Sequence, residues 1–302
     1  MIIPQSARIR IQKHMGNKTH AFLAQAENRL TKCINAWRLS SVSLMPTDTV
    51  NLLFSCESGL YGPCVLKMCI PGPEVTTEIN CLRAYDGKGY CKLWAYDRTD
   101  DALLLERVIP GDQLRAVTDY RERARLMAHT VKELHIPCDG AGQYPTYLSW
   151  MEGIRRKLTA MSGMEDVLLY LDKAMAVYAG LKRRHHRACL LHGDLHQENM
   201  LLNAKGAYTI IDPKGVVDDP VMETARFLMN ELPCEEGKIR EMAAILSPII
   251  GISQKDILAG MFVGAALSQS WTMEEHYPTR EASEKNKHSV LAICEFVYGL
   301  MK

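Results

Sequence analysis

Apolar residues recur with two different periods along the chain, and the change of period divides it. Between residues 5 and 38, apolar positions follow a helical spacing in otherwise polar sequence: Phe22, Leu23, Ala26, Leu30, Ile34 and Trp37. This stripe predicts an amphipathic helix that packs on a neighbouring layer. From residue 39 to residue 108, short apolar runs alternate with turn residues, which is typical of strands.

Five such runs predict a sheet in the first third of the chain. The expected strands are residues 39–50, 52–56, 64–68, 90–96 and 102–108. Residues 74–85 have a helical pattern and separate the third strand from the fourth. Short turn-rich connections favour antiparallel neighbours.

From residue 117 onward the pattern is mostly helical. The expected helices are residues 124–135, 148–161, 166–186, 223–231, 235–250, 255–271 and 280–301. The chain is therefore expected to adopt an α+β fold, with the sheet in its first part and most helices in its second part.

One stretch interrupts the helical part, and it contains most of the candidate catalytic and metal-binding residues. Residues 190–212 read L-L-H-G-D-L-H-Q-E-N-M-L-L-N-A-K-G-A-Y-T-I-I-D. Apolar runs surround a turn at residues 203–206, in which Gly206 is free to take a positive φ, so a β-hairpin is expected. Such a hairpin would bring Asp212 back beside Asn199, close to Asp194.

A convergence of these oxygens matches what phosphoryl transfer needs. Carboxylate and amide oxygens bind Mg²⁺, and a separate Asp orients the attacking hydroxyl. The spacing therefore predicts Asp194 as the catalytic residue and Asn199 and Asp212 as the metal ligands. A solvated loop followed by an ordinary hairpin is the simpler alternative for a motif of this length.

The motif H-G-D-L-H-Q-E-N with a later I-D-P resembles the catalytic and metal-binding loops of the aminoglycoside phosphotransferases, which share the protein-kinase fold. The longer run I-D-P-K-G-V-V-D-D-P-V-M-E-T-A-R-F-L is similar to the streptomycin 6-kinase and hydroxyurea phosphotransferase subgroup. Protein kinases carry H-R-D and D-F-G. Gly193, His196 and Pro213 depart from that pattern and indicate the small-molecule branch.

The resemblance implies a two-lobed protein-kinase-like fold. Residues 1–108 would form a nucleotide-binding lobe with a five-stranded antiparallel sheet, and residues 109–302 a helical catalytic and substrate-binding lobe. Lys67 lies in a predicted strand and Glu78 follows eleven residues later in a predicted helix. These positions match the lysine that clamps the nucleotide phosphates and the glutamate that holds it.

Two further nucleotide contacts follow from the resemblance. Neither G-x-G-x-x-G nor the P-loop signature occurs, so a Rossmann or P-loop enzyme is disfavoured. The turn at residues 46–51 would instead cover the phosphates, with Thr49 and Asn51 as hydrogen-bond donors. The backbone from Glu106 to Val108 would form the hinge that binds the adenine.

Acceptor-binding residues are expected where acidic side chains could attract a cationic substrate. Trp271 followed by Glu274 and Glu275 resembles the streptomycin-type enzymes. Asp219 lies in a D-P segment similar to the family's G-D-P-x-x-D, which braces the catalytic loop, and it joins this candidate set. A second acidic group contains Glu231, Glu235 and Glu236. An ordinary solvated charge cluster remains an equal alternative for each group.

Composition narrows the class of protein. The net charge of +1 supplies no global field for nucleic acid or anionic membrane. No apolar run approaches the ~18 residues of a membrane span, and the first residues lack the pattern of a signal peptide. The ten cysteines form no C-x-x-C pair, which disfavours a zinc site. We expect a cytoplasmic protein with reduced thiols, and the oligomeric state is not indicated.

The expected function is an ATP-dependent (or GTP-dependent) small-molecule kinase that uses Mg²⁺. An aminoglycoside of the streptomycin type is the favoured acceptor, with hydroxyurea, an amino alcohol or a sugar as the alternative. A kinase-fold pseudoenzyme is a second hypothesis, but the complete set of catalytic positions argues against it: Lys67, Glu78, Asp194, Asn199 and Asp212. A protein kinase is disfavoured because neither D-F-G nor A-P-E follows the catalytic motif.

Overall fold

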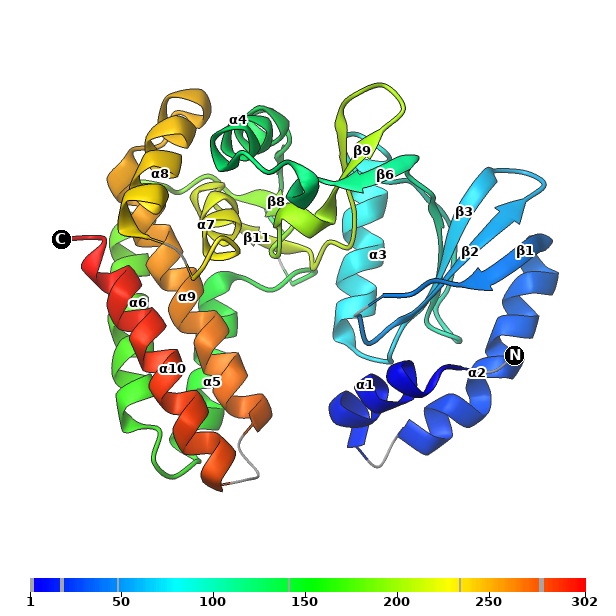
Figure 1. Ribbon diagram of the computed structural model, residues 1–302, viewed down its shortest axis with the longest axis horizontal. Coiled ribbons are helices and arrows are strands. Elements are labelled where there is room, and N and C mark those ends of the chain that lie inside the picture. The colour runs from blue at the N-terminus through cyan, green and yellow to red at the C-terminus, as the bar shows by residue number, and fades with distance from the viewer. Residues whose placement is uncertain (1–2, 17–18, 48, 141, 234, 277–279) are drawn as a thin grey trace. The chain divides into compact units, whose positions relative to one another are not determined.

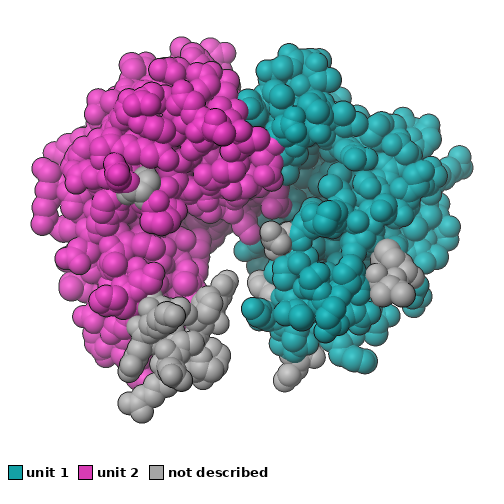
Figure 2. Space-filling model, viewed as in Figure 1, with its two compact units in different colours: residues 1–112, 201–211 teal, residues 113–200, 212–302 magenta. Residues whose placement is uncertain are grey.

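The computed structural model describes residues 3–16, 19–47, 49–140, 142–233, 235–276 and 280–302, without the side chains of residues 14, 275, 276 and 280–286. The chain divides into two compact units (Figure 2). The first unit contains residues 1–112 and 201–211, and the second contains residues 113–200 and 212–302. The first unit includes a segment from late in the chain because the hairpin at 201–211 joins one of its sheets.

The first unit contains the predicted five-stranded antiparallel sheet. Its strands, in chain order, are β1 (Leu39–Leu44), β2 (Leu52–Ser58), β3 (Gly62–Met68), β4 (Leu93–Asp97) and β5 (Ala102–Glu106). Their order across the sheet is β1-β2-β3-β5-β4, and Figure 1 labels the neighbouring strands β1, β2 and β3. All four neighbouring pairs are antiparallel, so β3 is the central strand.

Three boundaries in the first unit differ from the prediction. β1 ends at Leu44 instead of residue 50, because Pro46 lacks the N–H that a continuing ladder would need. Tyr90 makes an isolated bridge to Ile210 and is not part of β4. The single helix expected over residues 5–38 is two helices, α1 (Gln5–Met15) and α2 (Thr19–Trp37).

The two faces of this sheet are covered differently. Side chains alternate along a strand, and Cys64, Leu66 and Met68 of β3 lie in one apolar cluster with residues of α1 and α2. Lys67 points to the opposite face, where it meets helix α3 (Pro73–Tyr85). The alternation therefore separates the apolar face of the sheet from the face that carries Lys67.

The second unit is built from helices and a small sheet. Its helices are α4 (Tyr120–Val131), α5 (Tyr147–Thr159), α6 (Glu165–Lys182), α7 (Val221–Met229), α8 (Glu236–Ile250), α9 (Gln254–His276) and α10 (Arg280–Gly299). Each predicted helix is present, with shifted ends. α6, α9 and α10 lie side by side (Figure 1), and rings of Tyr170, Phe262 and Tyr298 meet among them.

Two three-stranded sheets contain the strands that come just before and just after the H-G-D motif in the chain. One has the order β11-β8-β7, from β7 (Ile136–Pro137), β8 (Cys189–Leu191) and β11 (Val216–Asp218). The other has the order β10-β9-β6, from β6 (Pro110–Gln113), β9 (Met200–Asn203) and β10 (Tyr208–Ile210). The predicted hairpin at residues 203–206 is confirmed, with Gly206 at φ +77° and Asn203 N–H bonded to Ala207 O at 2.8 Å.

No single helix in the described part of the chain is long and apolar enough to cross a membrane. The pair made of α8 and residues 254–274 meets that test only jointly, across a bend of 115°. The nine cysteines that the structure describes are free thiols.

Candidate active site

The first unit places Lys67 against Glu78, as the resemblance implied. The Lys67 Nζ lies 2.7 Å from Oε1 and 2.8 Å from Oε2 of Glu78. Both residues are buried, with 5% and 6% exposure. β3 and α3 follow each other in the chain, so the pair forms between consecutive elements. A buried charge needs such a partner, because removing either member leaves the other desolvated and unpaired.

The turn before β2 uses its polar side chains to hold itself together. The Asn51 Oδ1 accepts a hydrogen bond from Ile70 N at 3.0 Å, and the Asn51 N–H donates to Thr49 Oγ1 at 3.3 Å. Arg10 donates to the Thr49 carbonyl at 3.2 Å. Contact with phosphates would therefore fall to the Asn51 amide nitrogen and the Thr49 hydroxyl proton, and it stays a prediction.

The expected hinge follows directly on β5. The Glu106 N–H donates to Lys92 O at 2.8 Å and the Arg107 N–H to Pro63 O at 3.3 Å, so both are used within the unit. The Glu106 carboxylate accepts from the Lys92 N–H at 3.0 Å. In the described part of the chain, no partner takes the Val108 N–H. Of the predicted hinge residues, Val108 thus keeps a free donor.

In the second unit, β8 leads straight into the H-G-D motif. Gly193 has φ +83°, and a Cβ at this position would lie 2.9 Å from Val216 Cγ1 and 3.0 Å from Trp150 Cη2. Both the backbone conformation and the lack of space require glycine here. This explains why the chain has glycine where protein kinases have arginine.

Glu223 of α7 braces this loop. Its Oε2 accepts the His192 N–H at 2.6 Å and its Oε1 accepts the Gly193 N–H at 3.2 Å. Burial would raise the pKa of Glu223, but His135, whose Nε2 lies 3.6 Å from Oε2, and the nearby His192 lower the pKa below its usual value. Glu223 therefore remains an ionised acceptor and takes the bracing role of the family's aspartate.

Asp219 does not have the exposure that the predicted acceptor-binding role would require. It is 1% exposed, and its two oxygens accept the Arg187 N–H at 3.0 Å and the Val221 N–H at 3.1 Å. The second bond satisfies the first N–H of α7, and the first ties the segment before β8 to the start of this helix. We therefore correct that assignment: Asp219 is a structural residue at the start of α7.

Asp194 lies in the loop with its carboxylate partly exposed. Arg226 of α7 donates from Nε to Asp194 Oδ1 at 2.6 Å. The Asp194 side chain is 30% exposed, and its Oδ2 lies 4.0 Å from His196 Nε2. The sequence interpretation assigned no role to Arg226. Its spacing of three residues from Glu223 was the available signal, since both then face the same loop.

Asn199 and Asp212 lie at the same end of the hairpin. Asn199 directly precedes β9, and Asp212 follows two residues after β10. After Asp212, the chain returns to the loop, because the N–H groups of Lys214 and Gly215 donate to His192 O at 2.8 and 3.1 Å. The hairpin thus returns the segment that follows Asp212 to the H-G-D loop, as the sequence predicted.

This donor set fits one kind of metal. Among the described residues, no group of three or more His, Cys, Asp or Glu could hold a metal ion. Mg²⁺ is commonly held by one or two protein oxygens together with substrate phosphates. One amide oxygen and one carboxylate, from Asn199 and Asp212, match that chemistry better than a fully protein-built site.

His196 is tied to the residue two positions later. Its Nδ1 lies 2.7 Å from Glu198 Oε2, and Arg115 donates to Glu198 Oε1 at 2.9 Å. Burial lowers the pKa of His196, and this exceeds the upward effect of Asp194 and Glu198. The imidazole is therefore neutral at physiological pH.

Of the predicted acceptor residues, Trp271 has contacts that lead to the catalytic loop. Its ring packs edge-on against Trp150 at 5.6 Å between centroids, and Trp150 is the residue that borders Gly193. Trp271 is 37% exposed. Glu274 pairs with Lys157 of α5, so part of its charge is offset. The Glu275 side chain lies outside the described residues.

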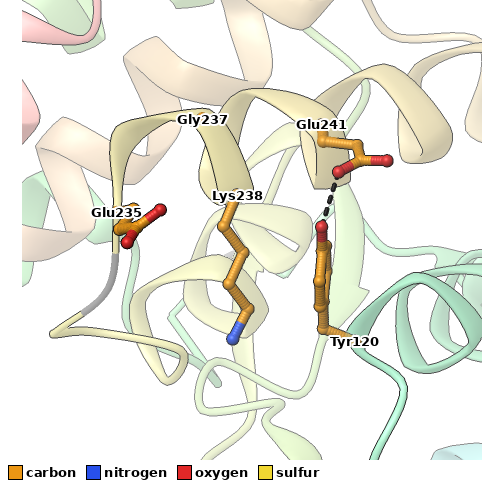
Figure 3. Close-up of a pocket in the computed structure, with 5 residues that line it drawn as sticks. All are labelled: Tyr120, Glu235, Gly237, Lys238 and Glu241. Atoms are coloured by element: carbon orange, nitrogen blue, oxygen red, sulfur yellow. Dashed lines mark hydrogen bonds between the residues drawn. The ribbon is translucent and has the colours of Figure 1, made fainter.

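The second acidic group is spread over different environments. Glu231 is buried and receives both Nε and Nη2 of Arg123, and Glu236 pairs with Arg240. Glu235 borders a hollow of about 600 Å³ with Tyr120, Gly237, Lys238 and Glu241 (Figure 3).

This hollow is lined by groups that mostly satisfy one another. The Tyr120 hydroxyl donates to Glu241, as the dashed line in Figure 3 marks. Arg121 also donates to Glu241, from Nε at 2.6 Å. Lys238 lies over the Tyr120 ring and reaches Glu231 at 3.2 Å. We assign no catalytic role to the hollow, since Glu241 and Lys238 are already bonded to Arg121 and Glu231.

Comparison with known proteins finds relatives of this chain among small-molecule kinases. The chain is 26% identical over 210 residues to streptomycin 6-kinase of Streptomyces griseus, covering 68% of this chain and 67% of that one. It is 25% identical over 215 residues to hydroxyurea phosphotransferase of Kitasatospora aureofaciens, covering 70% of this chain and 62% of that relative.

Solved structures show the same fold at low sequence identity. Choline kinase LicA from Streptococcus pneumoniae matches with a TM-score of 0.66 and 14% identity, over 90% of this chain and 99% of that one. Aminoglycoside phosphotransferase APH(4)-Ia matches with a TM-score of 0.63 and 14% identity, over 91% and 99%. The kinase-like fold expected from the motif is confirmed.

The family model described as "Aminoglycoside/hydroxyurea antibiotic resistance kinase" matches residues 36–276. That span includes the elements that carry Lys67, Glu78, Asp194, Asn199 and Asp212. The chain is therefore a small-molecule phosphotransferase and belongs to the aminoglycoside/hydroxyurea antibiotic resistance kinase family.

Proposed function

We propose that the chain transfers the γ-phosphoryl group of ATP, or of GTP, to a hydroxyl of a small cationic acceptor. The state of Asp194 carries this proposal. One of its oxygens is fixed by Arg226, and the other makes no hydrogen bond to a described residue while the side chain stays 30% exposed. A carboxylate held in this way can orient and accept the proton of an attacking hydroxyl.

The other predicted residues supply position and charge in this proposal. Asn199 and Asp212 would hold Mg²⁺, which when bound neutralises charge on the phosphates. Lys67, fixed by Glu78, would clamp the phosphates, and the Val108 N–H would bind the adenine edge. Most of the rate enhancement would come from positioning and electrostatics.

For the acceptor, we propose an aminoglycoside of the streptomycin type. Two observations support it: the named relatives include streptomycin kinases, and Trp271 joins the catalytic loop through Trp150 with Glu274 one turn further on. A partly exposed tryptophan ring and a carboxylate favour a guanidinium or ammonium group. Hydroxyurea is the second candidate, because one relative is named for it.

The decisive experiment compares Asp194→Asn with the unsubstituted chain. We expect kcat to fall by roughly 10²–10⁴, because the hydroxyl loses its proton acceptor, while Mg²⁺–ADP affinity is retained. Streptomycin, hydroxyurea, choline and simple sugars would serve as the acceptor panel, with phosphorylated product measured by mass spectrometry.

A matched variant controls for the loss of charge. Asp172→Asn removes an exposed carboxylate in the same unit, which pairs with Arg155 on the surface, and activity should be unchanged. Asp212→Asn should instead weaken Mg²⁺–nucleotide binding. Turnover by Asp194→Asn at the rate of the unsubstituted chain would contradict the proposal.

A further inference from the structure

The side chain of Asn199 has one end that can bind a cation and one that cannot. Only its Oδ1 carries lone pairs, whereas Nδ2 donates two hydrogens. The Nδ2 lies 3.1 Å from the backbone oxygen of Asp194. A carbonyl oxygen can only accept, so this contact alone assigns the amide and turns Oδ1 away from it.

The second hydrogen of this amide meets His196. The Asn199 Nδ2 lies 3.3 Å from His196 Nε2, so Nε2 must be an unprotonated acceptor. On the other side of the ring, Nδ1 lies 2.7 Å from a carboxylate oxygen of Glu198, so Nδ1 must carry the hydrogen. Two independent contacts thus assign the same tautomer.

One weaker contact competes with this assignment. The Glu198 N–H lies 3.3 Å from His196 Nδ1, where it would need an acceptor. The contact to the carboxylate is 0.6 Å shorter, by subtraction of 2.7 from 3.3 Å, and charge-assisted. Charge-assisted hydrogen bonds are about twice as strong as neutral ones, so the Nδ1–H tautomer holds.

Glu198 is itself anchored from distant parts of the second unit. Arg115 donates to its Oε1 at 2.9 Å, and Asn230 donates to its Oε2 at 2.6 Å. Arg115 is bonded in turn to the Asn230 carbonyl at 2.7 Å. The carboxylate that sets the histidine tautomer therefore has little freedom to rotate.

We propose that Glu198 and His196 are positioning residues for the metal-binding face of Asn199. Glu198 holds His196 as the Nδ1–H tautomer, His196 accepts from the Asn199 amide through Nε2, and Oδ1 is thereby turned toward the cation. This inference rests on the proposed function, in which Asn199 is a Mg²⁺ ligand. Partners that orient metal ligands commonly matter 10–100-fold for affinity.

The first test measures the tautomer without any metal. Nitrogen NMR of the full chain labelled with ¹⁵N-histidine, at about pH 8 where imidazole is neutral, should show a signal with Nδ1 protonated and Nε2 not. The variant His196→Gln identifies this signal by its loss. An Nε2–H tautomer at His196 would overturn the inference.

The second test measures divalent metal directly, with Mn²⁺ as a spectroscopic probe. In the presence of ADP, His196→Ala and Glu198→Gln should each weaken Mn²⁺ binding by roughly tenfold or more, as seen by electron paramagnetic resonance. A carboxamide at 198 cannot accept from Arg115 at one end and from His196 and Asn230 at the other, so at least one anchor is lost. ADP binding without metal should not change.

Two matched controls separate this effect from a general loss of charge or of histidine. His186 is exposed in the same unit, and Glu236 is an exposed surface carboxylate paired with Arg240. His186→Ala and Glu236→Gln should leave Mn²⁺ affinity within about twofold, as exposed substitutions usually do. Thermal unfolding identifies a variant that fails to fold. If His196→Ala does not fold, Glu198→Gln alone serves as the test, because a side chain that is 36% exposed can be replaced with little effect on folding.

The outcomes distinguish the inference from the proposed function. If the unsubstituted chain shows no ADP-dependent Mn²⁺ binding, the proposed function itself is wrong. If it binds Mn²⁺ and both variants bind equally well, only the positioning role is wrong. Weakened binding in both variants, with the Nδ1–H signal lost or shifted in Glu198→Gln, supports the inference.

Discussion

Two buried carboxylates, Glu78 in the first unit and Glu231 in the second, are held in different ways. In the first unit, Lys67 and Glu78 are eleven residues apart on consecutive elements. In the second unit, Glu231 receives Arg123 from 108 residues away and Gln197 from 34 residues away. A contact within one supersecondary unit can be inferred from spacing, whereas a carboxylate shared by distant segments cannot.

The backbone is also held differently at Lys67 and in the H-G-D loop. Lys67 sits on a central strand, whose ladder to β2 and β5 already fixes its backbone. The H-G-D loop lacks such a ladder beyond β8, so donors and acceptors from α7 and neighbouring segments must hold it. The H-G-D loop is therefore held by side-chain hydrogen bonds, whereas the backbone at Lys67 is held by the ladder of the sheet.

The largest effect is expected from breaking the pair in the first unit. Lys67→Met should lower the free energy of unfolding by about 3–5 kcal/mol, because it leaves the Glu78 carboxylate buried without its ammonium. Urea denaturation followed by circular dichroism measures this change.

A double variant sharpens that test. Lys67→Met with Glu78→Leu should regain most of the lost stability, since apolar residues of similar volume replace a buried ion pair at little cost. If the double variant is less stable than Lys67→Met alone, the pair does not act as an isolated unit, and the contrast with the second unit is wrong.

A smaller effect is expected where several donors share one carboxylate. Burial would raise the pKa of Asp256, but hydrogen bonds from Arg184, His185 and Ser253 lower the pKa to about 2. An unfolded Asp has a pKa near 3.9. Because the folded pKa is the lower one, the stabilisation is complete above about pH 5 and is lost as pH falls toward the folded value.

The variant Asp256→Asn therefore gives a pH-dependent difference. It should cost about 2 kcal/mol of unfolding free energy at pH 7, and the gap to the unsubstituted chain should shrink between about pH 5 and pH 3. Denaturation curves at several pH values measure the gap. A gap that stays constant, or widens in acid, would mean that Asp256 is not held by charge.

The smallest effect is expected from Arg226→Gln. It removes the charge-assisted bond that fixes one oxygen of Asp194. We expect kcat to fall about tenfold, which corresponds to about 1.4 kcal/mol. Both side chains are partly exposed, at 26% and 30%, so unfolding free energy should change little. Arg240→Gln, which breaks a surface pair with Glu236, is the control. Unchanged kcat would show that Asp194 is positioned without Arg226.

Local pattern accounts for most of what could be predicted. Strand alternation and turn residues predicted the sheet of the first unit, and the turn at residues 203–206 predicted the hairpin. Lys67 and Glu78 were identified from the resemblance to the kinase fold, because one lies on a predicted strand and the other on the next predicted helix. Each of these features depends on residues close in the chain, where spacing limits the geometry.

Features that join distant segments were missed or misjudged. Asp219 was taken as an acceptor residue, because a carboxylate near the motif gives no sign in the sequence of being buried. The strand β11 was not predicted, since its three residues become a strand only by pairing with β8. Arg226 was quoted within the family motif but received no role.

The order of residues by itself determined the periods of the helices and strands, the hairpin and the chemical identity of the motif, since these follow from neighbours in the chain. Only tertiary structure decided which carboxylates are buried and which oxygen of Asp194 is bonded to Arg226. Burial and hydrogen-bond partners depend on segments brought together over tens to a hundred residues, and no local spacing encodes them.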